Sequence, residues 1–115
     1  MRRFVFALAA ASFAAAPASA ADGGKLFALQ CKSCHGAKST PMGPALTGVV
    51  GAKIAGRADY KYSAGLTAKS GTWTAANLDA YLAKPAAFAP GTRMLTAVAD
   101  AASREAIIDY LGTLK

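Results

Sequence analysis

The segment Cys31-Lys32-Ser33-Cys34-His35 decides how the rest of this 115-residue chain is interpreted. Two cysteines separated by two residues and followed at once by a histidine form the attachment pattern of a c-type haem. The chemistry explains the spacing, because each thiol joins one vinyl group of the porphyrin as a thioether and the next residue lies beneath the iron. We therefore predict thioether links at Cys31 and Cys34 and an axial iron ligand at His35.

Other uses of this cysteine spacing fit the chain less well. A redox dithiol of the thioredoxin type lies beside a βαβ pattern, which is not visible in this sequence. A structural zinc site takes four ligands, usually Cys and His, whereas the chain has two Cys and one His. A disulfide across two intervening residues closes a very small loop and adds little stability. Haem attachment is the favoured interpretation, and a redox dithiol is the alternative.

The N-terminus has the composition of a secretory signal peptide. A basic start at residues 1–3 is followed by an apolar run from Phe4 to Ala16 and by the small residues Ala18-Ser19-Ala20. The 13 residues of the apolar run are fewer than the roughly 20 that a membrane helix needs. We predict cleavage after Ala20, export to the periplasm and a single domain over residues 21–115. A retained N-terminal anchor is the alternative.

The exported chain would be small and basic, without spare cysteines. Its 95 residues would carry 11 Lys and Arg against 6 Asp and Glu, a net charge of about +5. A covalently held haem would supply apolar surface that such a small core needs. Because the chain has neither a DNA-reading motif nor a dense run of basic residues, we expect no nucleic-acid partner. The charge fits an acidic protein surface or, more weakly, a membrane surface with anionic headgroups.

The apolar periodicity predicts three main helices, and the sequence between them predicts long loops. The helices are expected over roughly residues 23–31, 75–83 and 101–114. Asp22 and Thr74 are the expected N-caps of the first two, and Pro85 is expected to stop the second. Gly23 and Phe27 share one face of the first helix, which we expect to pack on the apolar face of the last.

Residues 36–71 are rich in Gly and Pro, which predicts a loop that wraps a flat prosthetic group, with a short helix near residues 64–69. Tyr60 and Tyr62 in this region offer hydroxyls that can reach haem propionates. Pro85 and Pro90 bracket a second wrapping loop.

The second axial ligand follows from elimination. The chain has no second histidine, and beyond the leader its only methionines are Met42 and Met94. Met94 lies about 60 residues after His35 and beyond two proline-bounded turns, so its segment can cross the opposite haem face. We predict that Met94 is the second iron ligand. Met42, only seven residues after His35, is expected to fill the core.

Taken in order, these motifs resemble a class I cytochrome c, of the small soluble bacterial kind that is similar to mitochondrial cytochrome c. The residues that carry the resemblance are Cys31 to His35, Gly43-Pro44-Ala45-Leu46, Gly71-Thr72-Trp73, Tyr81-Leu82 with Pro85, Pro90-Gly91-Thr92-Arg93-Met94, and Arg104 through Tyr110-Leu111. The resemblance implies an all-α cytochrome c fold, with three main helices and wrapping loops around one covalently bound haem c.

The resemblance also implies roles for residues around the haem. The Pro44 carbonyl would accept the imidazole N–H of His35. Tyr62 and Trp73 match positions that bind the propionates, and Tyr81 lies near the methionine ligand. Gly23 and Phe27 would pack against Ile107 and Tyr110 of the last helix. Two features depart from the mitochondrial members: the loop between His35 and Gly43 is shorter, and Ala52 stands where many of them place an arginine near a propionate.

The expected function is a periplasmic one-electron carrier and not an enzyme. It would be a monomer that shuttles electrons between respiratory or other redox partners with acidic docking surfaces. Lys32, Lys38, Lys69 and Lys84 are candidates for the basic rim that steers such partners. The alternatives are an electron-transfer subunit of a larger oxidoreductase, or a haem peroxidase or gas sensor if the methionine ligand is labile.

Overall fold

A computed structural model describes residues 20–115, so the predicted signal peptide lies outside the described residues except for Ala20. The described chain contains five helices: α1 (Ala20–Gln30), α2 (Ala64–Thr67), α3 (Ala75–Ala83), α4 (Pro85–Phe88) and α5 (Ala101–Thr113). Within these residues β structure is limited to two isolated bridges, Thr40 with Gly43 and Lys53 with Thr72. The predicted all-α class is therefore confirmed. No helix in the described part is long and apolar enough to cross a membrane.

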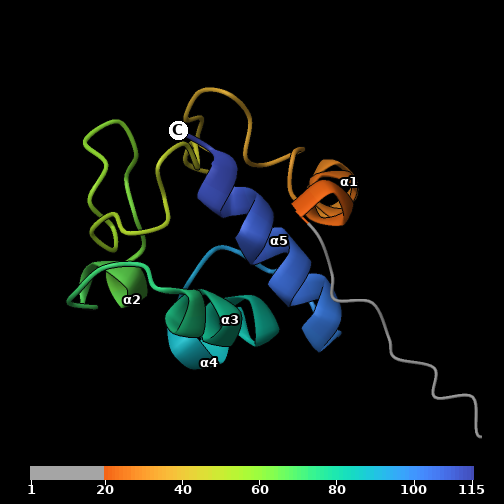
Figure 1. Cartoon of the computed structure of the whole chain (residues 1–115). Coiled ribbons are helices and arrows are strands. Elements are labelled where there is room, and N and C mark those ends of the chain that lie inside the picture. The colour runs from red at the N-terminus through yellow and green to blue at the C-terminus, as the bar shows by residue number, and fades with distance from the viewer. Residues whose placement is uncertain (1–19) are drawn as a thin grey trace, which may run out of the picture.

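Helix α5 lies between α1 and α3, and α4 packs beneath α3 (Figure 1). The crossing of α1 and α5 depends on Gly23, where an added Cβ would lie 1.9 Å from the backbone oxygen of Ala106. One turn later, the rings of Phe27 and Tyr110 pack with centroids 5.2 Å apart. Ile107 is almost completely buried. The predicted pairing of the first and last helices is thus confirmed, with Ala106 rather than Ile107 facing Gly23.

Hydrogen bonds near both ends of α5 also hold this helix in place. The Arg104 guanidinium donates to Asp79 of α3, with Nε 2.7 Å from Oδ1, and also to the carbonyls of Val98 and Ala99. At the C-terminal end of the helix, the backbone N–H of Gly48 donates to the Leu114 carbonyl at 2.8 Å. Helix α5 is therefore joined both to α3 and to the long loop between α1 and α2.

The helix boundaries show which terminal signals in the sequence were correct. Thr74 caps α3 in a reciprocal capping box with Asn77, as predicted. The expectation that Asp22 caps the first helix was wrong. It lies in the first turn of α1, where a carboxylate faces the positive end of the helix dipole. The loop expected after Pro85 contains the one-turn helix α4, because proline, with its fixed φ and missing N–H, suits a first helical position.

We expect opposite effects from adding a methyl group at two helical glycines. Gly23→Ala should lower the free energy of unfolding by more than about 2 kcal/mol, because the added Cβ must displace the Ala106 backbone. In α5, Gly112 has open space around the Cβ position, so Gly112→Ala should raise that free energy by roughly 0.5–1 kcal/mol. Denaturant titration of the haem-loaded variants measures both. A stable Gly23→Ala protein would contradict the close crossing of the two helices.

Candidate haem site

The two cysteines and the histidine lie on a turn that continues the C-terminal end of α1. The backbone N–H groups of Cys31 and Lys32 both donate to the Phe27 carbonyl, and that of His35 donates to the Cys31 carbonyl at 2.9 Å. Cys31 is buried, Cys34 is half-buried, and neither forms a disulfide. This turn brings both thiols and the imidazole to one end of the helix.

Burial, and to a smaller extent the neighbouring Cys34, raises the pKa of the Cys31 thiol. The attacking cysteine of a redox dithiol needs a lowered pKa, because the thiolate is the reactive form. The environment of Cys31 is therefore unlike that of a thioredoxin-type nucleophile.

The ring of His35 is oriented by the loop that follows it. Its Nδ1 lies 2.8 Å from the Pro44 carbonyl oxygen. A carbonyl only accepts hydrogen bonds, so the proton is on Nδ1 and the neutral ring keeps a lone pair on Nε2. Nε2 makes no hydrogen bond within residues 20–115 and is the nitrogen that a metal would bind. Gly43 allows this arrangement, since an added Cβ would lie 2.7 Å from the Cys34 carbonyl oxygen and 3.1 Å from the imidazole.

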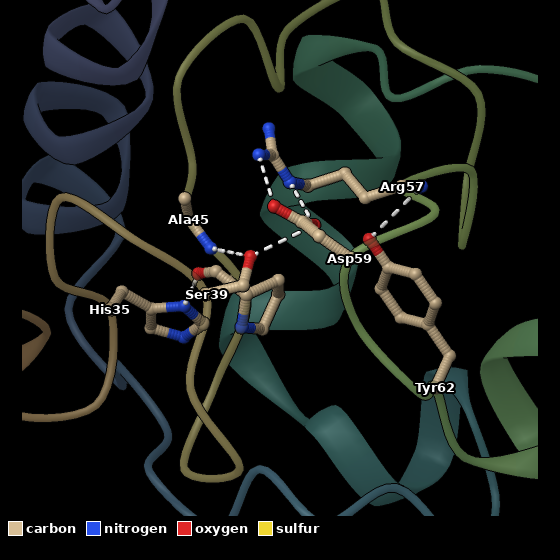
Figure 2. A network of polar contacts seen from close by, with 7 residues as sticks. His35, Ser39, Ala45, Arg57, Asp59 and Tyr62 are labelled. Carbon is tan, nitrogen blue, oxygen red and sulfur yellow. Dashed lines mark hydrogen bonds and ion pairs between the residues drawn. The ribbon is translucent and has the colours of Figure 1, made fainter.

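A network of polar contacts joins this loop to residues 57–62 (Figure 2). The Ala45 N–H donates to Ser39 Oγ at 2.9 Å, and the Ser39 hydroxyl donates to Asp59 Oδ1 at 3.0 Å. Arg57 binds both oxygens of Asp59, each at 2.9 Å. The sequence carries no signal that marks Ser39, Arg57 or Asp59 as site residues. An Arg-x-Asp sequence in a loop is too common to indicate a site, and the contact depends on loops that meet only in the folded chain.

Tyr62 remains a hydrogen-bond donor in this network. Its hydroxyl accepts a long bond of 3.4 Å from the Arg57 N–H, which leaves the phenolic proton free for another acceptor. Burial raises the pKa of Tyr62, so the phenol stays protonated near neutral pH.

Met94 packs, half-buried, against the apolar core that also contains Cys31, Trp73 and Tyr81. Its segment is held through Thr92, whose Oγ1 lies 2.7 Å from the Tyr81 hydroxyl and 3.4 Å from the Met94 backbone nitrogen. Arg93, which lies between Thr92 and Met94 in the sequence, donates from its side chain to the Tyr60 hydroxyl and to the Lys61 carbonyl. The structure therefore places Tyr81 beside the segment of Met94.

Aromatic rings close the core beneath this segment. The ring centroids of Trp73, Tyr81 and Phe88 lie 5.3–5.7 Å from one another. The backbone of Trp73 pairs with Ala52, and its indole N–H makes no hydrogen bond within the described residues. Trp73 and Tyr62 are thus two donors with protons available for a carboxylate. Arg57, the arginine nearest to Ala52 in the sequence, has its guanidinium bound to Asp59.

The other methionine lies elsewhere. Met42 is 69% exposed, so the expectation that it fills the core was wrong. It occupies the tip of a tight turn in which Thr40 and Gly43 exchange backbone hydrogen bonds, and this turn directs it away from the core. The residues present fit a covalently attached haem: two unpaired thiols, an imidazole with a free Nε2 lone pair, and a methionine side chain packed against the core.

The family model "Cytochrome c" matches residues 20–115. The chain is 39% identical over 94 residues to cytochrome c-type cyt cy of Rhodobacter capsulatus, an alignment that covers 80% of this chain and 47% of that protein. It is 40% identical over 91 residues to cytochrome c2 iso-1 of Magnetospirillum fulvum, covering 75% and 92% respectively.

Among solved structures, cytochrome cH from Methylobacterium extorquens matches with a TM-score of 0.77 and 43% identity, over 83% of this chain and 98% of that one. The chain spans about half the length of several curated relatives, including cyt cy. The family model covers all of the described residues, and the structural match agrees with it. The chain therefore belongs to the cytochrome c family, as a class I c-type cytochrome whose cofactor is covalently bound haem c.

Proposed function

We propose that this chain is an exported one-electron carrier in which Cys31 and Cys34 hold the haem and His35 and Met94 are its axial ligands. The observation that carries the proposal is the hydrogen bond from His35 Nδ1 to the Pro44 carbonyl, because it leaves Nε2 ready to bind iron. When bound, haem c supplies an iron that changes its charge by one electron. In cytochromes c, ligation of the iron by methionine and histidine raises its reduction potential.

The protein contributes closure and rigidity around the proposed ligands. With one nitrogen and one sulfur ligand in place, no coordination position is open to a substrate, which favours electron transfer over catalysis. Met94 packs against the apolar core, so its side of the proposed site is lined by apolar side chains. This apolar surrounding disfavours the additional positive charge of the oxidised iron. Tyr62 and Trp73 would donate their remaining protons to the haem propionates.

The partner is proposed to be a redox protein with an acidic docking surface. Lys32, Lys38 and Lys84 are exposed, as a steering rim requires. Lys69 is only half-exposed because its Nζ lies 4.4 Å from the centre of the Phe88 ring. Two exposed apolar side chains, Leu29 and Leu95, flank the haem motif and Met94 in sequence and offer the apolar contacts of a short-lived complex. Export to the periplasm after removal of residues 1–20, and a monomeric state, belong to this proposal.

The visible spectrum tests the ligand set. The haem-loaded protein should be low-spin and show an iron–sulfur charge-transfer band, without a shift under carbon monoxide. Met94→Ala should lose the band and bind carbon monoxide. The matched control Met42→Ala should keep the wild-type spectrum, because Met42 is exposed. A high-spin wild-type spectrum, or ready binding of carbon monoxide, would instead favour a peroxidase or gas sensor.

Unfolding of Gly43→Ala tests the support of the proximal histidine. The added Cβ would press on the imidazole of His35 and on the Cys34 carbonyl, which should lower the free energy of unfolding of the haem-loaded protein by roughly 1–3 kcal/mol. Gly36→Ala is the matched control, because Gly36 is exposed and its nearest neighbour would be 4.0 Å away. It should change that free energy by less than about 0.5 kcal/mol. Equal effects of the two substitutions would contradict the role of Gly43.

A further inference from the structure

The peptide group between Pro44 and Ala45 is hydrogen-bonded at both ends. Its carbonyl accepts from His35 Nδ1 at 2.8 Å, and its N–H donates to Ser39 Oγ at 2.9 Å (Figure 2). The peptide is a conjugated unit, so withdrawing positive charge at the N–H increases the negative charge on the carbonyl oxygen. A hydrogen bond at the Ala45 N–H therefore affects the hydrogen bond between the Pro44 carbonyl and the imidazole of His35.

The directions of the remaining hydrogen bonds are fixed by their chemistry. Ser39 Oγ accepts from the Ala45 N–H, and its own proton is donated to Asp59 Oδ1, because a carboxylate only accepts. The two hydrogen bonds from Arg57 keep Asp59 ionised: the pKa of this carboxyl is lowered, chiefly by that contact. The chain of contacts that begins at His35 thus ends on an ionised carboxylate that is paired with Arg57.

We propose that Ser39 and Asp59 are positioning residues that act through the Pro44–Ala45 peptide to set the electron affinity of the haem. The inference rests on the proposed ligation by His35. Each hydrogen bond in a chain polarises the next, so the carboxylate strengthens the Pro44 carbonyl as an acceptor. A stronger acceptor draws the Nδ1 proton and increases the basicity of Nε2. A more basic nitrogen favours the oxidised iron and lowers the reduction potential.

The contacts favour an effect that passes through the hydrogen bonds over a direct electrostatic effect of Asp59 on the iron. Asp59 is exposed, with its side chain 51% accessible, and it is paired with Arg57, so its direct electrostatic effect on a haem iron is small. Ser39 is half-buried and hydrogen-bonded on both sides, so within residues 20–115 it bridges the carboxylate and the peptide. The simpler explanation is that Ser39 only ties two loops together. The test must therefore measure the reduction potential and the His35 proton resonance as well as the free energy of unfolding.

The informative variant is Ser39→Ala, which breaks the chain of hydrogen bonds without changing the charge. In the haem-loaded protein we expect the equilibrium between reduced and oxidised forms, at a fixed applied potential, to shift about two- to threefold toward the reduced form. With 59 mV per tenfold change, this is a rise of roughly 18–28 mV in potential. The proton resonance of His35 Nδ1–H should move upfield, because its hydrogen bond is weaker.

Three further variants separate the explanations. Ser103→Ala removes a hydroxyl that also donates to a carboxylate, Asp100 at 2.7 Å, outside this chain of contacts, and should leave the potential unchanged. Ser39→Thr keeps the hydroxyl and should restore the wild-type potential and resonance. Asp59→Asn keeps an acceptor for Ser39 but removes the charge, and should raise the potential by less than Ser39→Ala does.

Two results would overturn the inference. One is a Ser39→Ala protein that is less stable but has the reduction potential of Ser103→Ala and the His35 Nδ1–H resonance of the wild type. Ser39 would then only connect the two loops. The other is a raised potential that persists in Ser39→Thr. The wild-type spectrum tests the proposed function separately: a low-spin His/Met spectrum with an unchanged Ser39→Ala potential rejects this inference alone, whereas a high-spin spectrum rejects the ligand set.

Discussion

The hydrogen bond between His35 Nδ1 and the Pro44 carbonyl is the contact on which the proposed site depends. It fixes which nitrogen carries the proton and therefore which one is left for iron. The loop can reach the ring only because Gly43 has no side chain, and it stays there because the next N–H is bound by Ser39. A short peptide segment thus sets the tautomer, the ring orientation and, through the inferred polarisation, the strength of the donor nitrogen.

The crossing of α1 and α5 places this contact within the fold. Gly23 brings α1 against the backbone of α5, and the Phe27 carbonyl then receives the N–H groups of Cys31 and Lys32. The position of the haem motif is therefore a consequence of helix packing one to two turns earlier in the chain. At the C-terminal end of α5, the hydrogen bond from the Gly48 N–H to the Leu114 carbonyl holds the long loop that also carries Pro44. One helix pair consequently positions both partners of the central hydrogen bond.

Much of this architecture could be predicted from the sequence, because the signals concerned are local. The capping residue Thr74, the periodic apolar face of α5 and the pairing of Gly23 with the last helix were all identified correctly. The errors have physical causes. A proline can start a helix as well as end one, so α4 was missed, and a methionine at a turn tip is directed by backbone geometry, so Met42 was misplaced. The contacts of Ser39 and Asp59 link residues 20 apart in loops, where no periodicity indicates which side chains meet.

The two sides of the proposed iron site are held very differently, and this difference follows from the contacts. The His35 side is fixed by an unbroken path of hydrogen bonds from the imidazole to Asp59 and Arg57. The Met94 side is anchored at Thr92 and next at Val98, whose backbone N–H donates to the Leu82 carbonyl at 2.8 Å. The residues between these anchors form no regular element, and Leu95 is 92% exposed. Segments with few buried contacts open at the lowest free-energy cost, so we expect any opening of the proposed site to begin at Met94 and not at His35.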